Sequence, residues 1–370
     1  MDLIVNIGYE NKEQLKNDLA HVIEQLSDGL KLDALEYVII SDDFASELFS
    51  FQRKRGLIEG YTKDEIGIAA GKLLSYVVDE SLKQAIFLQS CLLESSKVLA
   101  PIINHELCHA HDEFIKFQLF GQAFASNLKD NINKKRSLNE LLIIYANVIW
   151  SEYIANRLSR RPINIDNNIG SIDNAELINW DLKTLLDRII YERDHSKDSI
   201  IKYRRHADIN QLCSEIQKSV SRLLVAAGRF YGHLHAINND SLNNTFYEYI
   251  ETTYLEDVWD DLGYALQELY ATYPKWESTS IFDNLAELVL KTWNIFGIYP
   301  EEYSSGEHYV HVPFEGWFVG SINSKKYHNL NCRWANRIDP SNLIWFFGLE
   351  EAKAAKYKPC NICKPSDHED

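Results

Sequence analysis

The feature that most constrains the fold is a stretch from about Ser96 to Phe296 in which apolar residues recur at helical spacing. Few Gly or Pro residues interrupt this stretch, and these are the residues that most often end a helix. The sequence therefore predicts a long, wholly helical body for residues 96–298.

The first 95 residues show a different pattern. A polar amphipathic run over Lys12–Leu26 predicts a helix, whereas the apolar segments Glu36–Ser41 and Gln84–Gln89 predict strands. We expect a small α/β platform over residues 1–95, which together with the helical body forms one domain, residues 1–298.

A second, smaller domain is predicted at the C-terminus. Residues 299–316 are rich in Pro, Gly, Ser and acidic residues, as expected of a linker. Residues 317–370 begin with short strand-like segments, continue with a helix-like segment and end in an acidic tail. The predicted fold class is α+β, mainly α: a small N-terminal α/β platform, a helical body and a small C-terminal ββα module.

Charge and composition limit the partners of the chain. Hydrophobic residues make up 45% and charged residues 25%, which is typical of a globular protein. The formal net charge of −16 argues against nonspecific nucleic-acid binding by the whole chain, but residues 321–370 carry eight Lys or Arg against six Asp or Glu. A small basic module is thus attached to an acidic body.

The sequence also predicts where the protein resides. The N-terminus lacks the basic and apolar regions of a secretory signal, and the longest apolar stretch, about Leu141–Trp150, is far shorter than the roughly 20 residues of a membrane-spanning helix. Three cysteines lie singly in hydrophobic segments, where reduced, buried thiols are common: Cys91, Cys108 and Cys213. We expect a cytoplasmic protein without a membrane partner.

The segment His105-Glu106-Leu107-Cys108-His109 fits the pattern H-E-x-x-H inside a predicted helix, Lys97–Phe120. Four residues advance a helix by slightly more than one turn, so both imidazoles project from one face and can bind one metal ion. Glu106 would then stand beside the open coordination position, where it can take a proton from a zinc-bound water. The alternative is an amphipathic helix that carries two surface histidines without a chemical role.

A hydrolytic zinc ion needs a third protein ligand. A third histidine six residues after His109 is excluded, because that position is Ile115. The best candidate is Glu152, 43 residues after His109 on a second predicted helix, Leu138–Arg160. Asn156 shares the face of Glu152 and could support a ligand histidine. Glu152 could instead be an ordinary exposed carboxylate.

The segment HELCH followed by EYIAN resembles the gluzincin arrangement and is similar in particular to the ImmA/IrrE-type metallopeptidases, whose second motif places a glutamate ahead of an Ala-Asn pair. The resemblance covers about residues 84–160. It implies a zincin-like catalytic domain with Glu106 as general base and three zinc ligands, and a supporting role for Asn156. The implied ligands are His105, His109 and Glu152.

Four residues near the C-terminus form a second pattern, H-x3-C followed after 28 residues by C-x2-C: His328, Cys332, Cys360 and Cys363. Two pairs of close ligands, the second at a turn, are what a closed tetrahedral zinc site requires. A module of about fifty residues has little core of its own, so a structural zinc ion would supply stability. The alternative is a set of unpaired thiols.

The stretch from Gly320 to Pro365 resembles the zinc-binding domain of the Ada methylphosphotriester-repair protein. In that family four cysteines hold the zinc and one accepts the methyl group, whereas here the first ligand position is His328, so we expect a structural zinc ion without methyl transfer. Six basic residues and Trp334 could contact nucleic acid, or could form an ordinary solvated face: Lys325, Lys326, Arg333, Arg337, Lys356 and Lys358.

The resulting hypothesis is a zinc metallopeptidase with one catalytic and one structural zinc ion, acting on a peptide or on a dedicated protein substrate in a regulatory role. The rival hypothesis is a nucleic-acid-associated or sensing protein that uses the C-terminal module, with the H-E-x-x-H region inactive or structural. The residue that stabilises the oxyanion stays open among four candidates: His206, Tyr231, His233 and His235.

Overall fold

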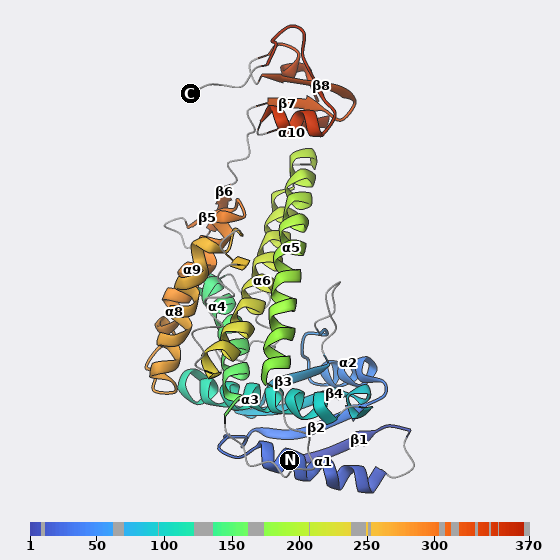
Figure 1. Cartoon of the computed structure of the whole chain (residues 1–370), viewed down its shortest axis with the longest axis vertical. Helices are drawn as coiled ribbons and strands as arrows, with labels where there is room; N and C mark the ends of the chain where they lie inside the picture. The colour runs from blue at the N-terminus through green and yellow to red at the C-terminus, as the bar shows by residue number, and fades with distance from the viewer. Residues whose placement is uncertain are drawn as a thin grey trace. The chain divides into compact units, whose positions relative to one another are not determined.

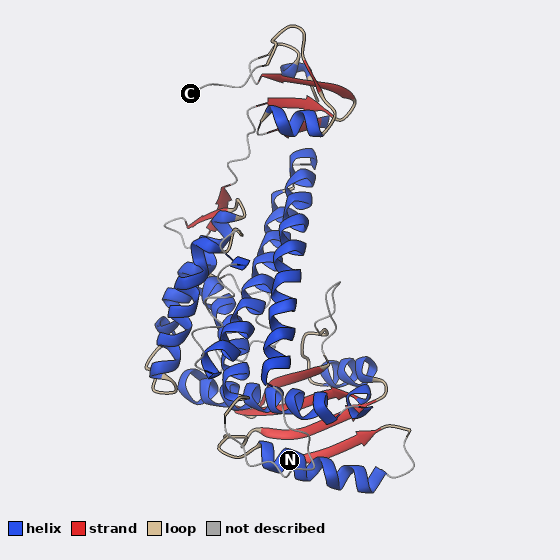
Figure 2. Ribbon diagram, in the orientation of Figure 1, coloured by secondary structure: helices blue, strands red, loops and turns tan. Residues whose placement is uncertain are grey.

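The computed structural model describes residues 1–8, 12–61, 70–94, 96–121, 136–161, 174–206, 208–237, 249–250, 253–302, 308–311, 318–329, 332–339, 342–346 and 348–365. Helix predominates over two small sheets and a strand pair (Figure 2), which confirms the predicted α+β, mainly α class. The chain divides into two compact units, Met1–Arg188 with Leu223–Val289, and Ile189–Arg222 with Leu290–Asp370. No helix in the described part of the chain has the length and apolarity needed to cross a membrane.

The first unit begins with a four-stranded sheet, drawn in blue at the N-terminal end of the chain in Figure 1. Its strands are β1 (Asp2–Asn6), β2 (Leu35–Ser41), β3 (Gly71–Val78) and β4 (Ser81–Gln89), in the order β1-β2-β4-β3. β1, β2 and β4 are parallel, whereas β3 pairs antiparallel with β4 and forms one edge of the sheet. Asp79 and Glu80 both have positive φ, as a two-residue hairpin turn requires.

Helices cover both faces of this sheet. On one face α1 (Lys12–Leu26) and α3 (Ser96–Phe120) bury an aliphatic set that includes Ile23, Leu107 and Ile86. On the other face α2 (Phe44–Lys54) packs Leu48 against Phe87. The apolar face of α3 thus fixes the H-E-x-x-H segment against the sheet, and the predicted α/β platform is present.

Further helices follow α3 in the chain: α4 (Leu138–Leu158), α5 (Asn174–His206), α6 (Ile209–Ile237), α8 (Glu256–Thr272) and α9 (Asp283–Ile295). One 3-10 turn, Ser90–Glu94, precedes α3, and another, Thr279–Phe282, precedes α9. A capping box between Ser137 and Glu140 begins α4. Buried polar bonds join α3 to α4, since Lys116 Nζ lies 2.8 Å from Asn147 Oδ1 and Asn104 Nδ2 donates to the carbonyl of Ser159 at 2.7 Å.

The second unit ends in a small module. Strands β7 (Phe318–Ser321), β8 (Ser324–Asn329), β9 (Leu343–Phe346) and β10 (Lys358–Pro359) pair in the order β10-β8-β7-β9, with a 3-10 turn at Ala335–Arg337 and helix α10 (Leu349–Ala354). The module contains two strands beyond the predicted ββα pattern. A hydrophobic cluster of seven side chains lies in its core: Phe318, Tyr327, Ile344, Phe346, Leu349, Ala352 and Tyr357. A second buried cluster surrounds two of the cysteines: Val319, Cys332, Ala335 and Cys360.

Two sequence expectations differ from the structure. The predicted linker contains regular structure, since β5 (Tyr299–Glu302) pairs antiparallel with β6 (His308–His311), whereas residues 303–307 and 312–317 lie outside the described residues. The aromatic and β-branched residues of β6 favour a strand. All six cysteines are free, but Cys91 is exposed rather than buried.

Candidate metal centres

Helix α3 brings the two histidines of the H-E-x-x-H segment together. The Nε2 atoms of His105 and His109 lie 2.9 Å apart, and the two rings are nearly perpendicular. The four-residue spacing on one helix places both rings on the same face. Little of either side chain is exposed, 16% for His105 and 11% for His109.

Glu152 on α4 completes a three-residue cluster. Its Oε2 lies 3.5 Å from His105 Nε2 and its Oε1 lies 3.7 Å from His109 Nε2. The donor atoms of all three residues lie within 4.8 Å of one another. The structure therefore brings together the three residues that were expected to bind one metal ion.

The cluster fits a metal ion of the size of zinc. Ligand bonds of about 2.0–2.2 Å in a tetrahedron place neighbouring donors about 3.3–3.6 Å apart, and the donor separations of 2.9, 3.5 and 3.7 Å lie around that range. Glu152 Oε2 is buried and accepts no hydrogen bond. A buried carboxylate oxygen without a donor is costly, and a cation would satisfy it.

The protonation of the cluster also suits metal binding. Burial, followed by the neighbouring His105, lowers the pKa of His109 to about 3, so its ring nitrogens are neutral. Burial alone would raise the pKa of Glu152, but its contacts with the two histidines and with the cation of Arg229 hold it below its usual range. A neutral imidazole and an ionised carboxylate are the forms that bind metals.

Glu106 lies beside this cluster and against the edge strand β3. It is 7% exposed, and burial is the main cause that raises its pKa above the usual value. The backbone N–H of Leu73 donates to its carboxylate. Gly71 makes this approach possible, because a Cβ at that position would stand 2.9 Å from Glu106 Cγ and Oε1.

One residue that supports the cluster, Ser151, was not predicted from the sequence. Ser151 Oγ lies 2.9 Å from His109 Nδ1, so this hydroxyl, adjacent to Glu152 in sequence, holds the ring of His109. The amide nitrogen of Asn156 donates to other residues: Nδ2 donates one hydrogen to Asp181 Oδ2 and one to the carbonyl of Arg229, each at 2.9 Å. Because both amide hydrogens are used in this way, support of a ligand histidine would have to come from the Asn156 oxygen, and that role stays a prediction.

Two charged residues near the cluster were not found from the sequence. Arg229 on α6 points its Nε toward Glu152 Oε2 at 3.7 Å and its Nη2 toward Asp181 Oδ1 at 3.9 Å. Asp181 on α5 lies 2.8 Å from His233 Nδ1. Both residues come from helices far from residues 105–152 in the chain, so no local spacing could have indicated them.

Three of the four residues considered for oxyanion stabilisation already have partners. Tyr231 donates its hydroxyl to the carbonyl of Trp259 at 2.9 Å. His233 lies between Asp181 at Nδ1 and Arg160 at Nε2. His235 Nδ1 lies 3.0 Å from the hydroxyl of Tyr153. The side chain of the fourth, His206, lies outside the described residues.

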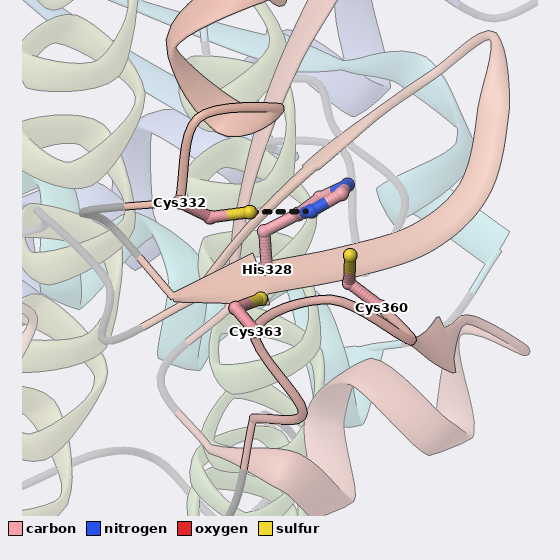
Figure 3. Close-up of side chains that lie close together, drawn as sticks. All are labelled: His328, Cys332, Cys360 and Cys363. Carbon is pink, nitrogen blue, oxygen red and sulfur yellow. Dashed lines mark hydrogen bonds between the residues drawn. The ribbon is translucent and has the colours of Figure 1, made fainter.

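The second predicted site is also assembled. Figure 3 shows the side chains of His328, Cys332, Cys360 and Cys363 gathered at one place, and their donor atoms lie within 4.8 Å of one another. His328 comes from β8, and Cys332 Sγ lies 3.5 Å from its Nδ1. Cys360 follows β10 directly.

The turn after β10 favours a thiolate. Burial would raise the pKa of Cys360, but the backbone N–H groups of Cys363 and Ile362 outweigh it, so the pKa is lowered. The N–H of Ile362 donates to Cys360 Sγ at 3.4 Å. One imidazole and three thiols around one point are a donor set suited to a closed tetrahedral metal site.

Comparisons of the chain with protein-family models, with curated proteins and with solved structures found no match. The geometry of these two centres is therefore what indicates the function of the protein.

Proposed function

We propose that the protein is a zinc-dependent peptidase of the gluzincin type, related to the ImmA/IrrE-type enzymes, that hydrolyses a peptide bond in the cytoplasm. The observation that carries this proposal is the convergence of His105, His109 and Glu152 from two neighbouring helices, with the carboxylate of Glu106 beside them. Three ligands leave one coordination position for substrate or water, which distinguishes a catalytic site from a structural one.

The residues have separate roles in this reaction. A zinc ion held by His105, His109 and Glu152 would supply Lewis acidity toward the peptide carbonyl and toward water. Glu106 accepts a proton from the water molecule as its oxygen adds to the carbonyl carbon. Glu106 then returns the proton to the amine nitrogen as the C–N bond breaks. The raised pKa of Glu106 suits both halves of this transfer.

The edge strand supports a peptide as substrate. Among the described strands β3 pairs with β4 alone, and its residues Gly71 and Leu73 lie against Glu106. An extended peptide can add to such an edge by main-chain hydrogen bonds, which would carry its scissile bond past the carboxylate. The free cysteines of the chain agree with a reducing compartment.

The C-terminal cluster is proposed as a second, structural zinc site. Its four protein ligands would leave no position open for chemistry. The seven core side chains of the module form a small hydrophobic core, and a metal ion would compensate for its size.

A contact with nucleic acid is the second candidate function of this module. Trp334 is 42% exposed, and the guanidinium groups of Arg333 and Arg337 lie 5.6 and 4.9 Å from its ring centroid. An exposed aromatic ring beside two cations could stack on a base while the cations contact phosphates. Electrophoretic shift of single-stranded DNA by the full chain, lost in Trp334→Ala, would support it.

The peptidase proposal is tested by metal analysis and by cleavage of a peptide library. We expect two zinc ions per purified chain and one in His105→Ala, measured by mass spectrometry of the metal. The wild-type chain should create new N-termini in a proteome-derived peptide library, whereas Glu106→Gln should create none. One zinc per chain that is unaffected by His105→Ala would refute the catalytic site.

A further inference from the structure

We propose that Arg229, whose guanidinium faces Glu152 at the edge of the candidate catalytic centre, stabilises the negative charge that develops on the carbonyl oxygen of the substrate. This inference rests on the proposed peptidase function and adds the oxyanion-stabilising group, which neither motif contains. The reaction needs such a donor, because adding water to a carbonyl turns its oxygen into an anion.

The position of Arg229 suits this role. The carboxylate of Glu152 lies between Arg229 and the ligand histidines. Its Oε2 is 3.7 Å from Arg229 Nε and 3.5 Å from His105 Nε2. Both Arg229 Nε and Glu152 Oε2 are buried without a hydrogen-bond partner. The distances to Glu152 and Asp181, 3.7 and 3.9 Å, are too long for hydrogen bonds, so charge holds the guanidinium near the centre. Its N–H groups therefore do not donate to either carboxylate.

Arg229 also reaches the surface from this position. Its side chain is 42% exposed although Nε is buried, so it lies at the boundary between the centre and solvent, where a substrate would enter. An arginine guanidinium keeps its positive charge at neutral pH, so Arg229 can donate charge-assisted hydrogen bonds to an oxyanion.

Two glycines bring α6 close enough to α4 for this contact. Gly228 and Gly232 are four residues apart on α6 and flank Arg229. A Cβ at Gly228 would stand 2.9 Å from the carbonyl oxygen of Ile149, and one at Gly232 would collide with the carbonyl oxygen of Tyr153. The two helix backbones can approach this closely only because both residues lack a side chain.

Buried polar contacts hold the backbone of Arg229 and its counter-ion Asp181 in place. Asn156 on α4 donates to the carbonyl of Arg229 and to the carboxylate of Asp181, which in turn faces the guanidinium. His233 holds the same carboxylate at 2.8 Å. Asn156 thus positions both the backbone of Arg229 and its counter-ion. Tyr231, His233 and His235, which were also considered for this role, each have a polar atom that already contacts a neighbouring residue.

The test compares two small probes of the zinc-loaded full chain by calorimetry. Methylphosphonate carries tetrahedral oxygens with negative charge and mimics the oxyanion, whereas imidazole is a neutral metal ligand without such an oxygen. A closed four-ligand site does not admit a further ligand, so both probes report on the three-ligand centre. Zinc content is measured for each variant. Arg160→Met is the matched control, because it removes a cation of the same buried region, one that contacts His233 rather than facing Glu152 as Arg229 does.

We expect Arg229→Met to lower methylphosphonate affinity by about tenfold or more, the effect of a lost charge-assisted hydrogen bond, while imidazole affinity and zinc content stay unchanged. Arg229→Lys should recover part of the loss, and Arg160→Met should change the methylphosphonate affinity less than threefold.

Equal methylphosphonate affinity in wild type and Arg229→Met would overturn the role of Arg229 while leaving the metal site intact. If wild-type protein binds imidazole but not methylphosphonate, the inference also fails. Failure of wild-type protein to bind either probe would instead refute the three-ligand metal centre.

Discussion

Gly71 lies against Glu106, and a Cβ at that position would stand 2.9 Å from both Cγ and Oε1 of the carboxylate. The edge strand and the proposed general base can therefore be neighbours only because residue 71 lacks a side chain.

Gly71→Ala should displace the carboxylate of Glu106 by a few tenths of an ångström or more and reduce turnover by about 10–100-fold, as misplaced catalytic groups do. Zinc content should not change, because the side chain that an added Cβ would meet, Glu106, is not a zinc ligand. Gly348→Ala is a matched control, since nothing lies within 4 Å of the added Cβ. Full activity of Gly71→Ala would contradict the proposed position of the base.

Glu106→Gln should abolish turnover, with a loss of at least about 10²–10⁴-fold, because the amide cannot accept a proton from water. The amide has nearly the same volume, so fold and zinc content should stay as in wild type. Circular dichroism and metal analysis provide the controls. Cleavage by this variant at the wild-type rate would show that Glu106 is not the base.

Glu152→Ala should sharply weaken zinc binding at the three-ligand centre, whereas Glu152→Asp should keep part of it, because a shorter carboxylate can still provide an oxygen. Competition with a chromophoric chelator measures the affinity. Glu152→Ala also leaves Arg229 without one of its two carboxylate partners, so thermal unfolding must be recorded in parallel. Unchanged zinc affinity in Glu152→Ala would remove Glu152 from the ligand set.

How much of this arrangement the sequence predicts depends on how local each contact is. The pairing of His105 with His109 follows from helix geometry alone, and the meeting of His328, Cys332, Cys360 and Cys363 follows from their spacing and residue types. Glu152 was a weaker prediction, because a single carboxylate on a helix has many ordinary explanations, and the resemblance to known peptidases added support for it.

The remaining contacts depend on tertiary packing and give no local signal. Arg229 and Asp181 lie on α6 and α5, and only the packing of these helices against α4 brings them to Glu152. Asn156 was correctly placed on the face of interest, but its partners are on those same distant helices. The strand in the predicted linker arises from pairing between β5 and β6, which a composition rich in turn residues conceals.

Cys360→Ser combined with Cys363→Ser should remove one zinc ion per chain and unfold the C-terminal module, because its small core depends on the metal. Tryptophan fluorescence of Trp334 and Trp345 and metal analysis would follow the change. Cys91→Ser is the control, since Cys91 is exposed and lies outside the cluster. Zinc at the three-ligand centre should persist. A double variant that retains both zinc ions would contradict the second site.

Gly232→Ala should separate Arg229 from Glu152 without touching either residue. The added Cβ would meet the carbonyl oxygen of Tyr153, the Cβ of Asn156 at 2.8 Å and the backbone nitrogen of Arg157 at 3.2 Å. Two of these are backbone atoms and none is the end of a flexible side chain, so α6 must move away from α4. Overpacking of this kind costs about 1–3 kcal/mol of unfolding free energy.

The displacement should carry Arg229 away from the centre, so methylphosphonate affinity should fall as in Arg229→Met, while zinc remains bound to residues of α3 and α4. Gly263→Ala is the matched control, because its added Cβ would meet the ring of Tyr231 at 2.7 Å rather than the backbone of α4. The control should lose stability without a selective loss of methylphosphonate binding. If Gly232→Ala is destabilised as much as Gly263→Ala but binds the probe like wild type, then close packing of α6 on α4 is not what positions Arg229.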